Sequence, residues 1–236
     1  MKNLLIVLSV VVIIGLVAFN NSPADESIKV PPGFAVQVFA EDVGTARHLA
    51  VTPQGIVYVK LGDLKDGRGI AVLRDADKDG KAEKQNGFGK FEGTGLVVKG
   101  DYLYASSDEE IFRYTLNAGV VTNPDSPDKL VTGLLSRGQH ASKSITLDNA
   151  GNLYTNVGAY SNDCQERDRT KGSKGRMPCP ILDSAGGIWQ FSASKLNQTY
   201  GNGKRYATGL RNVVGLDWNT ANNQLFVRSL SWQSFE

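Results

Sequence analysis

The sequence predicts an all-β fold of the β-propeller class, because one strand–turn–strand pattern occurs four times along the chain. In each copy a short apolar strand precedes a turn rich in Gly, Asn and Asp, and a second strand with an aromatic residue follows. That aromatic residue is Tyr58, Tyr104, Tyr154 and Phe226 in turn, with steps of 46, 50 and 72 residues. Periods of about 40 to 50 residues are typical of propeller blades. We therefore expect about four blades, preceded by an N-terminal hydrophobic helix.

The N-terminal segment, residues 1–24, differs in character from the rest of the chain. Lys2 precedes an almost uninterrupted apolar run over residues 4–19. A charged residue followed by such a run is typical of a secretion signal, and the run is shorter than the ~20 residues of a comfortable membrane-spanning helix. We expect a signal peptide or, alternatively, a signal anchor that inserts residues 4–19 into the inner membrane. Residues 25–236 then form one partial propeller domain, periplasmic or secreted.

Several strands are expected outside the four repeats. Alternating apolar residues predict a strand at 34–39, and apolar runs predict strands at 69–73, 110–115 and 187–191. The polar segment at 161–183, rich in Lys, Arg, Gly and Pro, is expected to be an insertion loop that accounts for the 72-residue step. The pattern shows no strong amphipathic helix after residue 24.

Charge and cysteine content narrow the classes of partner and compartment. The formal net charge is +2, from 26 basic and 24 acidic side chains, and no basic stripe stands out, so nucleic acid is not an expected partner. The two cysteines, Cys164 and Cys179, lie close together in the insertion loop. In an exported chain they are expected to form a disulfide that contributes about 3 kcal/mol. Free thiols or metal ligands are the alternatives, although no CxxC spacing or nearby His supports a metal site.

An acidic loop follows the strand predicted at 69–73 and has the composition of a calcium site. Its potential ligands are the carboxylates of Asp75, Asp77, Asp79 and Glu83 and the carbonyl of Lys81, with Gly80 at the bend. Calcium takes six to eight oxygen ligands, and Gly permits a sharp reversal of the backbone. Because the loop follows a strand, it is not an EF-hand. We expect structural Ca²⁺ binding here, and a solvated acidic turn is the alternative.

Two polar groups of residues precede repeats and are candidates for chemistry. His140 lies just before the third repeat, where an imidazole could accept a proton near neutral pH. His48 has the matching place before the first repeat, as an equivalent or as a packed neighbour of Arg47. Arg211 and Asn212 lie just before the fourth repeat, and a guanidinium beside an amide suits carboxylate or carbonyl oxygens. Ordinary loop-bracing roles remain open for all of them.

Taken together, these motifs resemble the glucose/sorbosone dehydrogenase family, whose members are six-bladed propellers that use pyrroloquinoline quinone (PQQ). The resemblance rests on Pro31 to Glu41, Arg47–His48, Gln139–His140 ahead of Ile145 to Tyr154, Asn162 to Cys164, Pro178 to Phe191 and, most specifically, Gly209 to Leu216. The segments around the two cysteines are similar to the bacterial sorbosone dehydrogenase branch. The resemblance covers roughly residues 30–227.

The resemblance implies oxidation of an aldose or a related sugar. His140 would be the general base at the sugar C1 hydroxyl, with hydride transfer to the quinone, and Arg211, Asn212 and Gln139 would bind PQQ. The implied partners are a sugar substrate and a periplasmic electron acceptor, and the implied cofactors are PQQ and Ca²⁺. The acidic loop at Asp75 is expected to be a separate, structural calcium site.

The chain also departs from the family pattern. Six blades of 45 to 50 residues need about 300 residues, so the chain is expected to be truncated at its C-terminus, and an inactive fragment is one alternative. A non-catalytic binding propeller and a calcium-dependent lactonase-type propeller are the alternative functions.

Overall fold

The computed structural model describes residues 28–230. Residues 28–39 belong to an N-terminal unit that ends at Phe39, and every described strand lies in the second unit, residues 40–236. The predicted targeting segment, residues 1–24, falls outside the described residues. The strand predicted at 34–39 is wrong, because these residues pair with no other strand in the described part of the chain. Period-two alternation without a partner strand does not make a strand.

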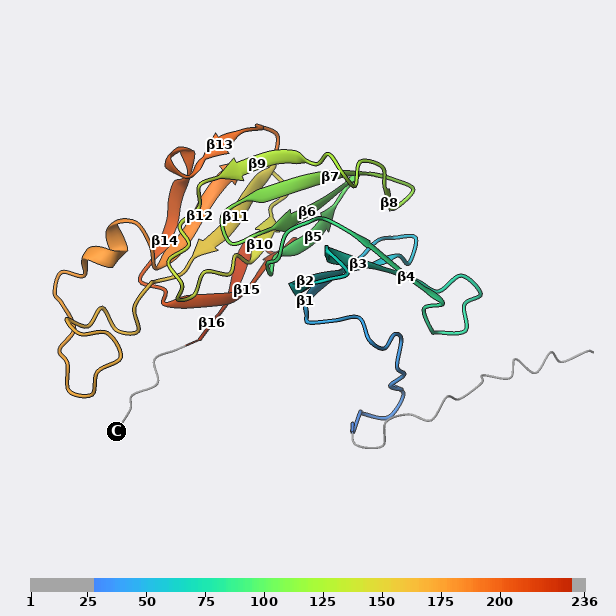
Figure 1. The fold of residues 1–236 in the computed structure, drawn as a ribbon, viewed down its shortest axis with the longest axis horizontal. Helices are drawn as coiled ribbons and strands as arrows, with labels where there is room; N and C mark the ends of the chain where they lie inside the picture. The colour runs from blue at the N-terminus through green and yellow to red at the C-terminus, as the bar shows by residue number, and fades with distance from the viewer. Residues whose placement is uncertain (1–27, 231–236) are drawn as a thin grey trace, which may run out of the picture. The chain divides into compact units, whose positions relative to one another are not determined.

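The strands of the second unit form antiparallel sheets that follow one another in chain order (Figure 1). The first sheet has the order β1 (Ala46–Val51), β2 (Val57–Lys65), β3 (Arg68–Arg74) and β4 (Lys84–Phe88). The second has β5 (Leu96–Lys99), β6 (Tyr102–Ser106), β7 (Ile111–Asn117) and β9 (Asp128–Thr132), with β8 (Val120–Val121) beside β7. The third has β10 (Ile145–Leu147), β11 (Asn152–Val157), β12 (Gly187–Ser192) and β14 (Lys204–Thr208). The fourth is a hairpin of β15 (Asn212–Asn219) and β16 (Gln224–Leu230).

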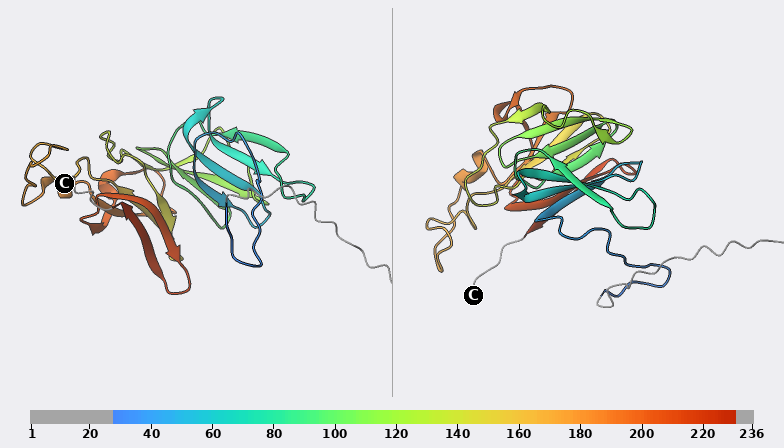
Figure 2. Two further views of the ribbon diagram at one scale, coloured as in Figure 1. Left: turned by 90° about the horizontal axis from the view of Figure 1, so that it is seen from below. Right: turned by 45° about the vertical axis from the view of Figure 1, so that its right-hand side comes forward.

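The first strand of each sheet lies beside the first strand of the next. Strand β1 contacts β5, β5 contacts β10, and β10 contacts β15. A channel of about 580 Å³ runs between them, and all four strands contribute to its walls, for example through Leu49, Val97, Ile145 and Leu216. Figure 2 shows these sheets from two further directions. Sheets that present their first strands to a common channel are the arrangement of a propeller, so the all-β, propeller-like prediction is confirmed for this part of the chain.

The apolar core lies between consecutive sheets. Tyr58 and Ile70 of the first sheet pack with Leu103 and Tyr114 of the second. A larger cluster joins the second sheet to the third, and a smaller one joins the third sheet to the hairpin through residues such as Tyr154. Alternate residues of each strand therefore bury against the neighbouring sheet, which fixes the register of each strand and with it the position of the loops at the strand ends.

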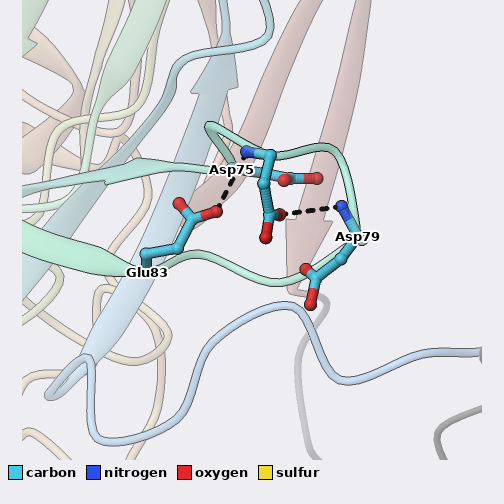
Figure 3. Close-up of side chains that lie close together, drawn as sticks. Asp75, Asp79 and Glu83 are labelled. Carbon is cyan, nitrogen blue, oxygen red and sulfur yellow. Dashed lines mark hydrogen bonds between the residues drawn. The ribbon is translucent and has the colours of Figure 1, made fainter.

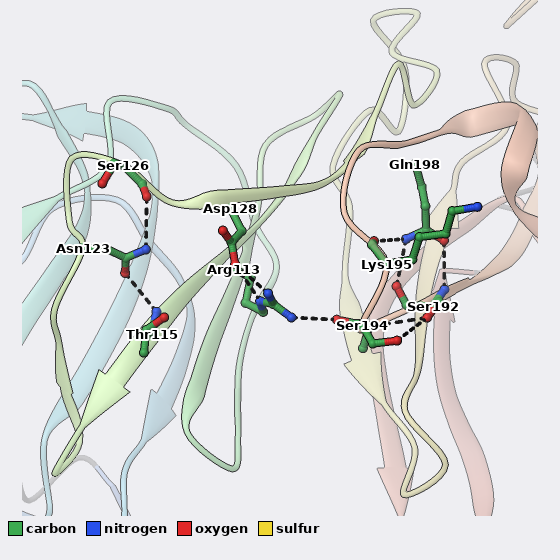
Figure 4. Close-up of polar contacts among 10 residues, drawn as sticks. Arg113, Thr115, Asn123, Ser126, Asp128, Ser192, Ser194, Lys195 and Gln198 are labelled. Atoms are coloured by element: carbon green, nitrogen blue, oxygen red, sulfur yellow. Dashed lines mark hydrogen bonds and ion pairs between the residues drawn. The ribbon is translucent and has the colours of Figure 1, made fainter.

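Polar contacts also tie the second sheet to the third (Figure 4). The short strand β13 (Gln198–Thr199) lies between β12 and β14 in the chain, but it pairs in parallel with β9 of the second sheet. The buried side chain of Gln198 donates to the carbonyls of Ser192 and Lys195 at 2.8 and 2.7 Å. Arg113 of β7 pairs with Asp128 at 2.6 Å and donates to the carbonyl of Ala193 at 3.2 Å. The two sheets are thus held in one relative position by both apolar and polar contacts.

Candidate active site

Residues at or near the starts of the first strands of the four sheets, together with the loop between β6 and β7, line one cavity, which we call the mouth cavity. Its volume is about 460 Å³, within the range of about 300 to 1,000 Å³ that is usual for small-molecule sites. Its polar lining comes from all four sheets and includes His48, Thr94, Asp108, His140 and Asn212. His140 and Asn212, two residues that the sequence singled out, therefore meet at one place although they are far apart in the chain.

His140 is held in an unusual backbone conformation at this cavity. Its φ angle is +52°, in the left-handed region that few L-residues adopt. Its Nδ1 lies 2.5 Å from the carbonyl oxygen of Ala159, and since a carbonyl oxygen only accepts, Nδ1 carries the proton. Gly158 lets the two segments approach, because a Cβ there would lie 2.5 Å from the Cβ of His140. The neutral imidazole consequently keeps a free lone pair on Nε2.

The surroundings of His140 favour its neutral form. Burial lowers the pKa of His140, and the positive charges of Arg211 and Arg169 lower it further, against the opposing effects of the Ala159 carbonyl and the Asp168 carboxylate. The net result is a pKa below the ordinary histidine value of 6.5. At pH 7 the imidazole is therefore available as a proton acceptor.

Arg211 is linked to His140 through the backbone of Ala159. The Ala159 N–H donates to the Arg211 carbonyl at 2.8 Å, while the Ala159 carbonyl accepts from His140. The Arg211 side chain, however, lines a second cavity of about 220 Å³, the disulfide pocket, rather than the mouth cavity. Its Nε is buried and has no hydrogen-bond partner. Burial, followed by the charge of Arg169, lowers the pKa of Arg211.

The disulfide pocket is built by the insertion loop. Cys164 and Cys179 form the expected disulfide, with a Cα–Cα distance of 5.9 Å. The segment at 161–183 is irregular apart from a short 3₁₀ helix, η1 (Pro180–Asp183), as the prediction of a loop requires. The pocket is lined by Cys164, Cys179, Met177, Ile181, Leu182 and Leu210, with Arg176 and Arg211 as its basic groups.

Gln139 is engaged by two residues of the insertion loop that the sequence did not single out. Its amide Nε2 donates to Asp168 at 2.5 Å, and its Oε1 accepts from Arg169 at 2.9 Å. Asp168 also accepts from the backbone N–H of Asn162 at 2.7 Å. No motif marks Asp168 or Arg169 in the sequence. Only folding of the loop over the residues before β10 brings them to the site.

Two buried lysines lie next to the mouth cavity, and no motif in the sequence marks either of them. Lys143, between His140 and β10, is fully buried, and burial lowers its pKa to about 8. Lys60 of β2 is also fully buried, donates to the carbonyls of Gly69 and Phe91, and has a pKa lowered to about 7 by burial. The carboxylate of Asp108, which lines the cavity, raises the pKa of both lysines.

The acidic loop between β3 and β4 is far in sequence from His140 and Asn212. Its carboxylates lie close together (Figure 3). Ligand atoms of Asp75, Asp77, Asp79 and Glu83 all lie within 4.8 Å of one another. Asp75 accepts from the N–H of Gly80 at 3.0 Å, and Glu83 accepts from the N–H of Ala76 at 2.8 Å. The Lys81 N–H donates to Asp79 at 2.8 Å. The loop therefore wraps around its own carboxylates.

The carboxylates of Asp77 and Glu83 are shifted in opposite directions. The N–H of Asp79 lowers the pKa of Asp77, but desolvation, a hydrogen bond with Glu83 and the charges of Asp79 and Glu83 outweigh it, so the pKa of Asp77 is raised. The pKa of Glu83 is lowered, chiefly by the backbone N–H of Ala76. A bound cation would favour the charged form of both groups. The four carboxylates are hard oxygen donors of the kind that Ca²⁺ prefers.

Residues 28–235 match the TrAA12-like family. The chain belongs to this family. Among curated proteins, none matches the chain in sequence. The glucose/sorbosone dehydrogenase resemblance is thus refined to a TrAA12-like assignment.

Solved structures agree with the propeller-like fold. The iodide structure of the Trichoderma reesei family AA12 enzyme has a TM-score of 0.67 at 18% identity, over 85% of this chain and 49% of that one. The holo PQQ domain of Coprinopsis cinerea pyranose dehydrogenase has a TM-score of 0.62 at 19% identity, over 81% and 45%. The PQQ-bound aldose sugar dehydrogenase of Streptomyces coelicolor has a TM-score of 0.52 at 18% identity, over 83% and 59%. The TrAA12-like chain spans about half the length of the first two.

The location of this TrAA12-like protein is indicated by its disulfide. A disulfide between Cys164 and Cys179 is favoured in an oxidising compartment outside the cytoplasm. Among the described residues, 28–230, no helix has the length and apolar character needed to cross a membrane. The apolar run at 4–19, proposed as signal or anchor, falls outside that range.

Proposed function

We propose that this protein takes part in the PQQ-dependent oxidation of an aldose or a related sugar, with His140 as the general base. The observation that supports this most strongly is that His140 and Asn212 share the mouth cavity, while Ala159 joins His140 to Arg211. The likeness in fold adds weight, because the Streptomyces coelicolor structure that this chain resembles is a PQQ-bound aldose sugar dehydrogenase. The sugar substrate and a periplasmic electron acceptor are the partners that this activity requires.

The step assigned to His140 is proton removal at Nε2. Nδ1 is committed to the Ala159 carbonyl, so a substrate hydroxyl would donate its hydrogen bond to the free lone pair of Nε2. The lowered pKa keeps that nitrogen unprotonated at pH 7. The carbonyl of Ala159 then stabilises the imidazolium that forms. Removal of a proton by a positioned base contributes roughly 10²- to 10⁴-fold in rate.

The residues assigned to the cofactor fit its chemistry. PQQ is a planar quinone with three carboxylates, and it supplies the two-electron acceptor when bound. Asn212 offers an amide at the mouth cavity. Arg211 offers a buried Nε without a hydrogen-bond partner, but in the disulfide pocket, so a contact with a cofactor in the mouth cavity would require its side chain to turn. Both suit anionic and carbonyl oxygens. For Gln139, a contact with the cofactor would require it to exchange a bond to Asp168 or Arg169.

For calcium, we propose that Asp75, Asp77, Asp79, Glu83 and the Lys81 carbonyl bind one structural Ca²⁺ ion. The gathering of these carboxylates within 4.8 Å supports this assignment. At a free Ca²⁺ concentration about 100 times the Kd, the ion should stabilise the fold by about 2.7 kcal/mol. Calorimetry should detect binding in the wild type and lose it in Asp77→Asn. A melting temperature that is the same with and without a chelator would contradict the proposal.

The test of the activity is a dye-linked assay. With PQQ, Ca²⁺ and an aldose, the wild type should reduce an artificial acceptor, and His140→Gln should lower kcat at least 100-fold without impairing folding. Asn149→Ala, on the exposed turn of the same repeat, serves as the control and should keep full activity. Hydrolysis of a lactone without PQQ would favour the lactonase alternative instead. If the protein shows neither dehydrogenase nor lactonase activity, the alternative of a non-catalytic binding propeller is favoured.

A further inference from the structure

His48 lies at the place where the mouth cavity meets the central channel. It is on β1, directly opposite Lys60 of β2 in the strand register, and it lines both cavities. Its side chain is only partly buried. The proposed reaction assigns no role to His48. It is, however, one of only two histidines in the chain, and it lines the same cavity as His140.

The imidazole of His48 lies near the backbone of the hairpin. The backbone of Val214, two residues after Asn212, raises the pKa of His48, and Val214 lines the mouth cavity together with it. In the neutral ring one nitrogen carries the proton and the other keeps its lone pair. The mouth cavity is therefore lined by two imidazoles that each retain one acceptor.

The charges around His48 favour this neutral form. Burial lowers its pKa, and the charge of Arg47 lowers it further, against the effect of the Val214 carbonyl. Arg47 and Asp108 also line the mouth cavity, and Lys60 lies across the strand pair. At pH 7 the cavity thus offers two imidazole acceptors and one carboxylate, with the amide of Asn212 and the hydroxyls of Thr94 and Ser144 beside them.

We infer that His48 is a second ligand-binding imidazole, and that the mouth cavity selects ligands with several hydroxyl groups on one ring by engaging His48 and His140 together. A ligand with one hydroxyl can satisfy only one of the two acceptors, whereas a sugar ring presents hydroxyls on several carbons. Acceptors that line one cavity from two sheets discriminate against a ligand that leaves one of them desolvated and unpaired. The inference rests on the proposed function and adds His48 to it as a residue that determines specificity.

Histidine NMR tests this directly, because a chain with two histidines gives two imidazole signals. The protein is labelled with ¹³C at the imidazole Cε1 position, and the signals are assigned with His48→Gln and His140→Gln. D-glucose is titrated in, first with the protein alone and then with PQQ and Ca²⁺ present. Cyclohexanol, a ring of the same size with one hydroxyl, is the control ligand. Leu49→Ala is the control variant, because Leu49 is the neighbour of His48 on β1 and lines the channel but not the mouth cavity.

The expected result is that D-glucose moves both signals with one shared Kd, and that cyclohexanol binds at least tenfold more weakly. His48→Gln should weaken glucose binding about fivefold, the usual effect of one lost hydrogen bond, and Leu49→Ala should not. If glucose moves only the His140 signal, this inference is wrong while the proposed function stands. If neither signal moves under either condition, the sugar site itself is refuted, and the proposed function with it.

Discussion

The third sheet and the β15–β16 hairpin contain the same sequence repeat, but they bury its aromatic residue to different degrees. Tyr154 on β11 is 3% exposed, donates to Asp148 at 3.0 Å and stacks on Trp218 at 5.4 Å. Phe226, at the matching place on β16, is 52% exposed. The reason is that β11 lies between two strands, whereas β16 pairs only with β15 in the described residues. Burial of the repeat aromatic therefore depends on neighbours and not on the repeat itself.

The same difference separates the two halves of the candidate site. His140 precedes a four-stranded sheet and is covered by a loop that a disulfide closes. Asn212 begins a two-stranded hairpin whose position depends on the contacts of β15 with β10 and β11. The third sheet thus provides the more extensively paired side of the mouth cavity. The position of the other side, formed by the hairpin, depends on packing of β15 against β10 and β11.

The largest expected effect is on folding stability at the matched aromatics. Tyr154→Ala should cost about 3 to 5 kcal/mol of unfolding free energy, since it removes a buried ring and one of the hydrogen bonds to the Asp148 carboxylate. Phe226→Ala should cost less than about 1 kcal/mol, because the ring is half exposed. Urea unfolding of the two variants beside the wild type makes the comparison. Equal losses would show that the hairpin is as well packed as the third sheet.

A somewhat smaller effect is expected from opening the loop that covers His140. Replacing both cysteines, Cys164→Ser and Cys179→Ser, should cost about 3 kcal/mol by releasing the chain entropy of the closed loop. Reduction of the wild type with dithiothreitol should lower the free energy of unfolding by a similar amount, which appears as a lower urea midpoint. The double variant should not respond to the reductant. A wild type whose midpoint is insensitive to reductant would contradict a stabilising disulfide.

The smallest effect is a pH dependence of the unfolding free energy that arises from Lys143, which precedes the third sheet. Burial lowers its folded pKa to about 8, whereas an unfolded lysine titrates near 10.5. Between these values the unfolded chain binds the extra proton, so stability rises with pH, by up to about 1.4 kcal/mol per pH unit. Well below pH 8 both states are protonated, so the pH dependence vanishes and the cost of burying the charged lysine is fully present. From pH 8 to 9.5 the wild type should gain about 1.6 kcal/mol relative to Lys143→Met, measured by urea unfolding, and parallel pH profiles would refute the shift.

Much of the fold could be predicted from the sequence, because propeller strands have recognisable local patterns of apolar and turn residues. The hairpins that end in Tyr58, Tyr104 and Tyr154 and the loop around Cys164 follow from turn residues and composition. Strand β14 was missed because its residues, Lys204–Thr208, are mostly polar and exposed. The predicted strand at 34–39 was wrong because alternation does not reveal whether a partner strand exists.

The candidate site was predictable only in part. The mouth position of His140 and Asn212 follows from their places before repeats. Their link through Ala159 does not, because a backbone hydrogen bond leaves no mark in the sequence. Asp168 and Arg169 reach Gln139 only through the path of the insertion loop. The assignment of metal and cofactor ligands remains a proposal from residue chemistry.

The central claim is that His140 and Asn212, from two different sheets, serve one reaction in one cavity. A double-mutant cycle on kcat/KM in the dye-linked assay, with PQQ and Ca²⁺ present, tests this most directly. His140→Gln and Asn212→Ala should each lower kcat/KM, and the double variant should differ from the sum of the single effects by about 0.5 kcal/mol or more, as expected for residues that share a site. Strict additivity, or no acceptor reduction by the wild type, would contradict the account.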